Sequence, residues 1–212
     1  MQHFVKEIEE FWQQLETTIE QVLESRDDNQ FDAELLLGEY RNRLQVIDEN
    51  LTFHFEADEE GPIEMIFGCD GYPESIHSVL SLVGAAPVVS GIKFKAFNHR
   101  YDPIPNSINV AGEMCEISDY WFALHNNAKK LHLTIYMPIV PDVLETDPRV
   151  EAVMIFLDAL IGEYELMTKI WALDWIETPA DPIDYGLKPL QELRESFDGI
   201  KGEVSPIGIT FH

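Results

Sequence analysis

Basic residues and cysteines are both scarce in this sequence of 212 residues. It has 14 Lys and Arg against 39 Asp and Glu, which gives a net charge of −25. Because proteins bind nucleic acids mainly through Lys and Arg that neutralise phosphates, this balance argues against nucleic-acid binding and against an anionic membrane surface. The two cysteines, Cys69 and Cys115, lack C-x-x-C spacing. They argue against a disulfide framework or a thiolate zinc site and favour a reducing compartment.

Long apolar runs are missing as well. No segment approaches the roughly 18 consecutive apolar residues of a membrane-spanning helix, and the first residues do not form the apolar stretch of a secretory signal. We therefore expect a cytoplasmic protein with no membrane partner. The 45% of hydrophobic residues supply enough apolar material for a full core, which excludes bulk disorder.

Motifs that would identify an enzyme are also missing. The sequence has no G-x-S-x-G elbow, no P-loop and no G-x-G-x-x-G turn, and its seven histidines form neither H-x-x-x-H nor H-E-x-x-H. His125 and His132 flank a predicted hairpin turn and could approach each other, but a metal needs a third ligand that no spacing supplies. We therefore predict no catalytic residues, no metal site and no cofactor.

One pattern of elements occurs twice in the chain. Two alternating strands joined by a polar turn, then an amphipathic helix and a third strand run over residues 51–98, and the same order recurs over 119–176. The two polar turns are residues 58–62 and 126–130. Since strand–helix–strand crossovers are right-handed in nearly all sheets, both helices should lie on one face of the sheet. The pattern predicts an α+β fold, in which two strand-strand-helix-strand units form one mixed, mostly antiparallel sheet of about six strands.

The N-terminal residues predict a helical hairpin. Residues 3–25 carry an apolar stripe at helical spacing, which consists of Phe4, Ile8, Phe11, Leu15, Ile19 and Val22. A polar break at 27–29 separates this helix from a second one over 32–47. We expect the hairpin to span residues 1–48 and a sheet domain to span 49–212, with both parts in one compact domain.

The second copy of the pattern sets further boundaries. Asp147-Pro148 is a typical N-cap and first-turn pair, Gly162 is expected to end the helix, and a strand is predicted over 166–176. A short helix is predicted over 188–197. Residues 100–118, which contain two prolines, are predicted to be an irregular connector between the copies.

The alternation in the strands also predicts a second sheet face with polar and aromatic side chains. Its members are Thr52, His54, Lys93, Lys95, His132, Thr134 and Tyr136. Two interpretations remain open, because the N-terminal hairpin could cover this face or the face could bind a partner. The second interpretation makes His54, His132 and Tyr136 candidate binding residues.

The segment from Gly162 to Ile170 reads G-E-Y-E-L-M-T-K-I and follows a helix that ends in F-L-D-A-L. It resembles a group of uncharacterised bacterial proteins that carry G-E-Y-[DE]-x-x-T-[RK]-I after such a helix. The resemblance implies no activity, but it makes Glu163, Tyr164 and Thr168 candidate binding residues in a turn before the strand. The structural alternative is that Tyr164 fills the core and Glu163 accepts backbone N–H groups.

Charge is the strongest functional signal that remains. The first 60 residues hold 17 acidic and 4 basic residues, so negative charge is concentrated there. This segment is either a solubilising helical surface or a surface that meets a basic protein partner. We interpret the chain as an acidic protein-binding or regulatory module. The alternative is a hydrolase with an unrecognised carboxylate or His site, and homo-oligomerisation stays open.

Overall fold

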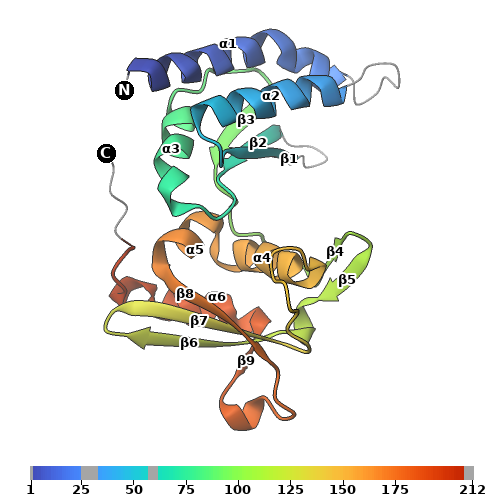
Figure 1. Cartoon of the computed structure of the whole chain (residues 1–212), viewed down its shortest axis with the longest axis vertical. Helices are drawn as coiled ribbons and strands as arrows, with labels where there is room; N and C mark the ends of the chain where they lie inside the picture. The colour runs from blue at the N-terminus through green and yellow to red at the C-terminus, as the bar shows by residue number, and fades with distance from the viewer. Residues whose placement is uncertain (1, 25–32, 57–61, 208–212) are drawn as a thin grey trace. The chain divides into compact units, whose positions relative to one another are not determined.

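The computed structural model describes residues 2–24, 33–56 and 62–207, and its contacts divide the chain between Phe97 and Asn98 into two compact units (Figure 1). The α+β fold is confirmed. The strands of the described residues form separate sheets of three, two and four strands, so the single six-stranded sheet that we predicted is wrong. Each copy of the repeated pattern pairs its strands within itself. The predicted boundary at residue 48 lies inside the first unit, and the single compact domain stays a prediction.

The first unit begins with the helix pair that the apolar stripe predicted. α1 (Gln2–Glu24) and α2 (Ala33–Ile47) lie side by side. The α1 stripe is buried from Ile8 to Val22, while Glu9, Glu16 and Glu20 are exposed on the opposite side. The predicted break at 27–29 lies outside the described residues, as do most of the residues of the turn at 58–62.

These helices cover the aromatic face of a three-stranded sheet. The sheet consists of β1 (Thr52–Glu56), β2 (Ile63–Gly68) and β3 (Ile92–Ala96), with β1 antiparallel and β3 parallel to the central β2. Edge-to-face ring contacts join the helices to the strands, and they involve Phe11, Trp12, Tyr40, Phe53, Phe67 and Phe94. The hairpin therefore covers the aromatic face, and the interpretation that it covers the face with Thr52 and His54 is wrong.

A buried polar cluster fixes the crossover helix of the first unit. α3 (Ile76–Gly84) follows a 3-10 turn that starts at Pro73. The carboxylate of Asp48 accepts hydrogen bonds from Ser75 Oγ at 2.9 Å and from Ser78 Oγ at 2.7 Å. Because both serines are buried, these bonds satisfy groups that would otherwise destabilise the core. The cluster ties the end of α2 to the start of α3.

The second unit repeats the strand pairing of the first. In the four-stranded sheet, β6 (Trp121–Asn127) is antiparallel to β7 (Lys130–Met137), which is parallel to β8 (Ile170–Glu177). The crossover from β7 to β8 contains α4 (Pro148–Ile161), and Asp147 caps α4 by accepting from Arg149 N–H. The duplicated strand-strand-helix-strand order is therefore confirmed at the level of pairing.

Three predictions for the second unit are wrong. The connector contains a hairpin of β4 (Ser107–Val110) and β5 (Glu113–Glu116), whose turn residues Ala111 and Gly112 both have positive φ. A short helix, α5 (Glu163–Lys169), precedes β8 where we expected turn and strand. The predicted last helix starts late, because Lys188–Pro189 forms the strand β9 and α6 spans Leu193–Ile200. Pro189 has no N–H to donate within a helix, which is consistent with the later start.

The core of the second unit lies between α4, α6 and one face of the four-stranded sheet. From the strands it takes Phe122, Leu131, Leu133, Ile135 and Met137, and from the helices mainly Val153, Phe156, Leu157, Leu160, Leu193 and Phe197. The strand residues in this group alternate along β6 and β7, so their neighbours point to the other face. The sheet thus has one face under helices and one face, here called the outer face, that turns away from them.

We predict that Phe67→Ala destabilises the first unit by about 3–5 kcal/mol, since Phe67 is fully buried among Phe11, Trp12, Phe53 and Phe94. Native-state hydrogen exchange of the β2 amides measures this loss. The control is Tyr72→Ala, because Tyr72 is half exposed and its truncation should change stability by no more than about 0.5 kcal/mol. Equal effects of the two substitutions would contradict the aromatic core.

Candidate functional site

The outer face of the four-stranded sheet is the candidate functional site. Register and alternation place nine side chains on it: Trp121, Ala123, His125, His132, Thr134, Tyr136, Ala172, Asp174 and Ile176. None of them belongs to the hydrophobic core cluster of the described residues. His125, Asp174 and Ile176 are exposed, while Trp121, His132 and Tyr136 are half-buried. Apolar and aromatic groups on a sheet face without helices point to a binding surface.

The nine side chains form three rows across the strands. Trp121 lies opposite Tyr136, with Ile176 beside it on β8. The middle row is Ala123, Thr134 and Asp174, and the third row is His125, His132 and Ala172. Side chains directly opposite each other in a sheet are in contact range, so each row acts as one surface strip. The middle row, with the small side chains of Ala123 and Thr134, thus lies between a row with two aromatic rings and a row with two histidines.

Asp174 gives this surface its charge. It is exposed, and no ion pair with it occurs in the part of the chain that the structure describes. Its row neighbour Thr134 is buried and uncharged. An exposed carboxylate one row away from Trp121 and Tyr136 can attract a Lys or Arg side chain, whose cation can also lie over an aromatic ring. The arrangement can therefore bind a basic side chain.

The predicted approach of His125 and His132 is confirmed, because the two residues are direct partners in the β6–β7 ladder. Among the described residues, no group of three His, Cys, Asp or Glu side chains is placed to hold a metal ion. The turn that brings these histidines together contains Ala128 and Lys129, both with positive φ, as in a two-residue type I′ hairpin.

The structure places two of the six predicted site residues on the outer face and three in α5. His132 and Tyr136 share the outer face, two rows apart on β7. His54 belongs to the first unit, where its Nε2 lies 3.5 Å from a carboxylate oxygen of Glu56. Glu163, Tyr164 and Thr168 lie in the helix α5, which contributes none of the nine outer-face residues.

The predicted polar face included three of the nine outer-face residues, and Trp121, Asp174 and Ile176 are among the six that it missed. The signal for Trp121 was present, because it alternates with Phe122 and so points away from the core. Asp174 and Ile176 were missed because the predicted strand started four residues early, which obscured the alternation of its second half.

The motif that starts at Gly162 reverses the chain between α4 and α5. This reversal, with the contacts of Glu163 to Asn98, is here called the joint. Gly162 ends α4 with φ of 87°, and Glu163 then turns back towards Asn98. Glu163 N–H donates to the Asn98 carbonyl at 3.1 Å, and Asn98 N–H donates to the Glu163 carboxylate at 2.9 Å. The structural interpretation of Glu163 as an acceptor of backbone N–H is therefore confirmed. The expectation that Tyr164 fills the core is wrong, since its side chain is 42% exposed.

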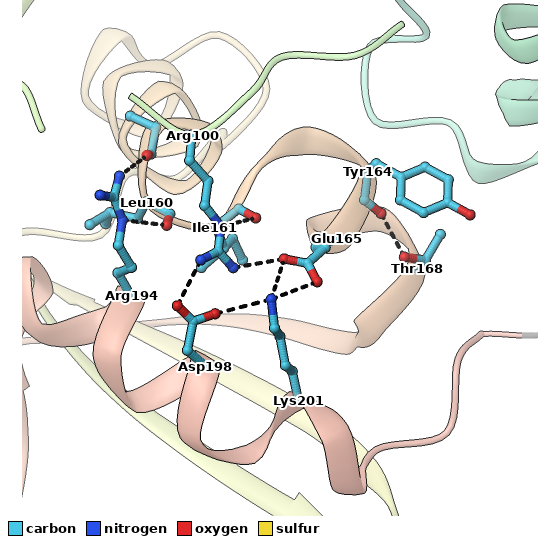
Figure 2. A network of polar contacts seen from close by, with 10 residues as sticks. Arg100, Leu160, Ile161, Tyr164, Glu165, Thr168, Arg194, Asp198 and Lys201 are labelled. Atoms are coloured by element: carbon cyan, nitrogen blue, oxygen red, sulfur yellow. Dashed lines mark hydrogen bonds and ion pairs between the residues drawn. The ribbon is translucent and has the colours of Figure 1, made fainter. Parts of the chain in front are cut away.

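A charged network surrounds this joint (Figure 2). The Arg100 guanidinium donates to Glu165 at 2.7 Å and to Asp198 at 2.8 Å, and Lys201 Nζ lies 3.0 Å from Glu165 and 3.1 Å from Asp198. The hydrogen bond from Arg100 lowers the pKa of Asp198 to about 2. Two cations and two carboxylates thus neutralise each other. The network connects the start of the unit with α5 and α6 and offers no unpaired catalytic group.

Two arginines also satisfy the carbonyl groups at the end of α4. Arg194 donates to Leu160 at 3.1 Å and to Ala159 at 2.8 Å, and Arg100 Nε donates to Ile161 at 3.0 Å. Within α5, Thr168 Oγ1 donates to the Tyr164 carbonyl at 2.6 Å. These contacts account for the polar residues of the motif through the fold. Glu163 and Thr168 are buried by that role, which leaves Tyr164 as the exposed member.

One carboxyl group at the joint has an unusual protonation state. Burial raises the pKa of Asp158 to about 7, and the nearby charge of Glu163 adds to this rise. Asn98 Nδ2 donates to Asp158 at 3.3 Å, which opposes the rise. The group is therefore close to half protonated at neutral pH, and its charge depends on pH in the range where most carboxyl groups are fully ionised.

No family model, curated protein or solved structure matches this chain. The likeness of the Gly162 segment to uncharacterised bacterial proteins therefore stays a prediction. The helices that the structure describes include none that is long and apolar enough to cross a membrane.

We predict that Gly162→Ala destabilises the second unit by about 1–3 kcal/mol, because its φ of 87° strains any residue with a side chain. The control is Gly199→Ala, since Gly199 is exposed inside α6 and a methyl group added there would meet nothing within 4 Å. That change should be neutral or stabilising by up to about 1 kcal/mol. Urea denaturation of both variants measures the difference, and a neutral Gly162→Ala would contradict the strained joint.

A second prediction concerns the pH dependence of stability. Asp158 binds its proton more tightly in the folded state, with a pKa of about 7, than in the unfolded chain, where about 3.9 is usual. Stability should therefore fall as pH rises from about 4 to about 7 and should then stay level. Asp158→Asn mimics the protonated acid, so it should remove this fall and be more stable than wild type at about pH 8 by roughly 1–3 kcal/mol.

Urea denaturation at several pH values measures this profile. The matched control is Asp184→Asn, on an exposed turn of the same unit, which should keep the slope of the wild type. An unchanged slope in Asp158→Asn would show that this carboxyl group does not titrate in the range given.

Proposed function

We propose that this chain is a protein-binding module and that the outer face of the second unit binds a basic segment of a partner protein. The observation that carries the proposal is the exposed Asp174 on β8, which is one row away from Tyr136 on the neighbouring strand, while Trp121 lies opposite Tyr136 on β6. A carboxylate and an aromatic strip together favour Lys or Arg over neutral side chains. Aromatic residues are also the residue type most enriched in the energetic centres of interfaces.

The charge of the whole chain supports the same choice of partner. A net charge of −25 attracts basic proteins over a longer range than any single contact, and this attraction raises the rate of association. The exposed Glu9, Glu16 and Glu20 on α1 add to this field in the first unit. Charge thus guides the approach, while the outer face supplies the short-range contacts.

The hydrolase hypothesis has weaker support. Its best candidate is the pair of Asp158 and Glu163, since one member has a raised pKa. Both carboxylates, however, accept hydrogen bonds from Asn98. The Glu163 carboxylate accepts from the backbone N–H of Asn98, and the Asp158 carboxylate accepts from its side-chain amide. Their geometry is explained by the joint after α4, so the protein-binding function is the one we propose.

The test places a photo-cross-linking amino acid, benzoylphenylalanine, at Tyr136 of the full chain. In the matched control, benzoylphenylalanine replaces Met114, which is 58% exposed in the β4–β5 hairpin of the same unit. We expect cross-links to a basic protein from the Tyr136 position alone, and we expect their yield to fall as salt rises from about 50 to about 300 mM, because salt screens exposed charges. Equal products from both positions would contradict the proposal.

Once the cross-linked protein is identified and purified, two variants separate the short-range contact of Asp174 from the long-range attraction of the net negative charge. Asp174→Asn should weaken binding roughly tenfold, or about 1.4 kcal/mol, mainly through faster dissociation. The triple change of Glu9, Glu16 and Glu20 to Gln should mainly slow association, since these residues lie in the other unit and off its apolar stripe. If Asp174→Asn binds like the wild type, the outer face is not the binding surface.

A further inference from the structure

The edge of β6 is only partly paired. β6 has seven residues, but β9 pairs with just Trp121 and Phe122. Gly186, with φ of 72°, ends a 3-10 turn two residues before β9 begins. In the described part of the chain, no strand lies beside residues 123–127 on that side. Such an edge offers unpaired backbone groups to another strand.

The hairpin register shows which backbone groups point outward. A two-residue turn makes Asn127 and Lys130 a hydrogen-bonded pair, so the odd-numbered residues of β6 bond to β7. The N–H and C=O groups of Leu124 and Asn126 therefore face outward. The contacts with β9 follow the same pattern. The carbonyl of Tyr120, another even-numbered residue, points outward and accepts a hydrogen bond from Leu190 N–H at 3.0 Å.

A pocket of about 260 Å³ lies beside this edge. Leu124 and His125 line it from β6, and Gly186 and Lys188 line it where β9 begins. Across from them lie Ser196 and Ile200 of α6. The lining contains no carboxylate, although the chain has 39 of them.

Lys188 is the charged group of this pocket. It is exposed, and its Nζ lies 3.1 Å from Ser196 Oγ, with no carboxylate paired to it in the residues that the structure describes. Most other cations of the second unit are used by the fold. Arg100, Lys201 and Arg149 form ion pairs, while Arg194 donates to backbone carbonyls. A cation placed between a pocket and an unpaired strand is suited to a carboxylate on an extended peptide.

We propose that the free edge of β6 binds an extended segment of another protein, which adds a strand along residues 123–127, in line with β9, and places a Glu or Asp side chain against Lys188. The backbone groups of Leu124 and Asn126 give the added strand its hydrogen bonds, and Lys188 selects its acidic side chain. This site is distinct from the outer face and does not depend on it. The net charge of −25 opposes the approach of any acidic segment, so the preference for Glu over Gln must come from the short-range contact with Lys188.

A second copy of this chain fits the edge less well. Pairing β6 with β6 of another copy would offer Lys188 no carboxylate, because residues 123–127 of β6 contain none. It would also bring together two chains that each carry a net charge of −25. The acidic segment of a partner is therefore the occupant that the charges favour.

The test uses the full chain and pools of eight-residue peptides, acetylated and amidated at their ends. The pool positions contain Val, Ile, Thr and Tyr, and one central position is Glu, Gln or Lys. We expect the Glu pool to bind at least fivefold more tightly than the Gln and Lys pools, and to slow amide hydrogen exchange at Leu124 and Asn126. The amides of Ala123 and His125 should change little, because they already bond to β7.

Two variants make the result specific. Lys188→Gln should remove the preference for the Glu pool but keep binding of the Gln pool, whereas Lys93→Gln in the first unit should change neither. The proposal is overturned if no pool binds, if the Lys pool binds as well as the Glu pool, or if other amides are protected. It is also overturned if the chain alone protects Leu124 and Asn126 as its concentration rises, since a second copy would then occupy the edge.

Discussion

The carbonyl groups at the C-terminal end of α4 are the constraint on which the second unit depends. A helix leaves its last carbonyls without partners, and buried carbonyls without partners are costly. Arg100 and Arg194 donate to three of them, and Tyr101 N–H donates to a carbonyl that Arg194 also contacts. One arginine comes from the start of the unit and the other from α6. Satisfying this helix end therefore holds together segments that are about 60 and 35 residues away in the chain.

Gly162 makes this solution possible. Its positive φ ends α4 and reverses the chain, so Glu163 can bond with Asn98 in both directions. The charged network of Arg100, Glu165, Asp198 and Lys201 then closes around the same joint. These polar groups satisfy one another, whereas Asp174 on the outer face is exposed and forms no ion pair among the described residues. The functional proposal rests on that difference.

Periodicity in the sequence predicted much of the fold, and it failed where two periods overlap. The stripe of α1 and the alternation of β7 are long and regular, and both were assigned correctly. The segment after Gly162 is ambiguous, because Glu163, Leu166, Met167 and Ile170 are buried at helical spacing while the residues after them alternate. The β4–β5 hairpin was hidden by short strands. For the site, the sequence identified His132 and Tyr136 but could not show that β8 adds Asp174 to the same face, since register depends on pairing.

The pairing of strands within each copy has a consequence for the order of folding. Every strand partner of β1, β2 and β3 lies before residue 98, so the first sheet needs no residue from the second half of the chain. A ribosome releases the N-terminal half first, and short separations between partners favour fast pairing. The first unit can therefore bury its aromatic rings while the second is still being translated. The four-stranded sheet has to wait for β9 and α6, so its hairpin of β6 and β7 spends the longest time in the nascent chain without its final neighbours.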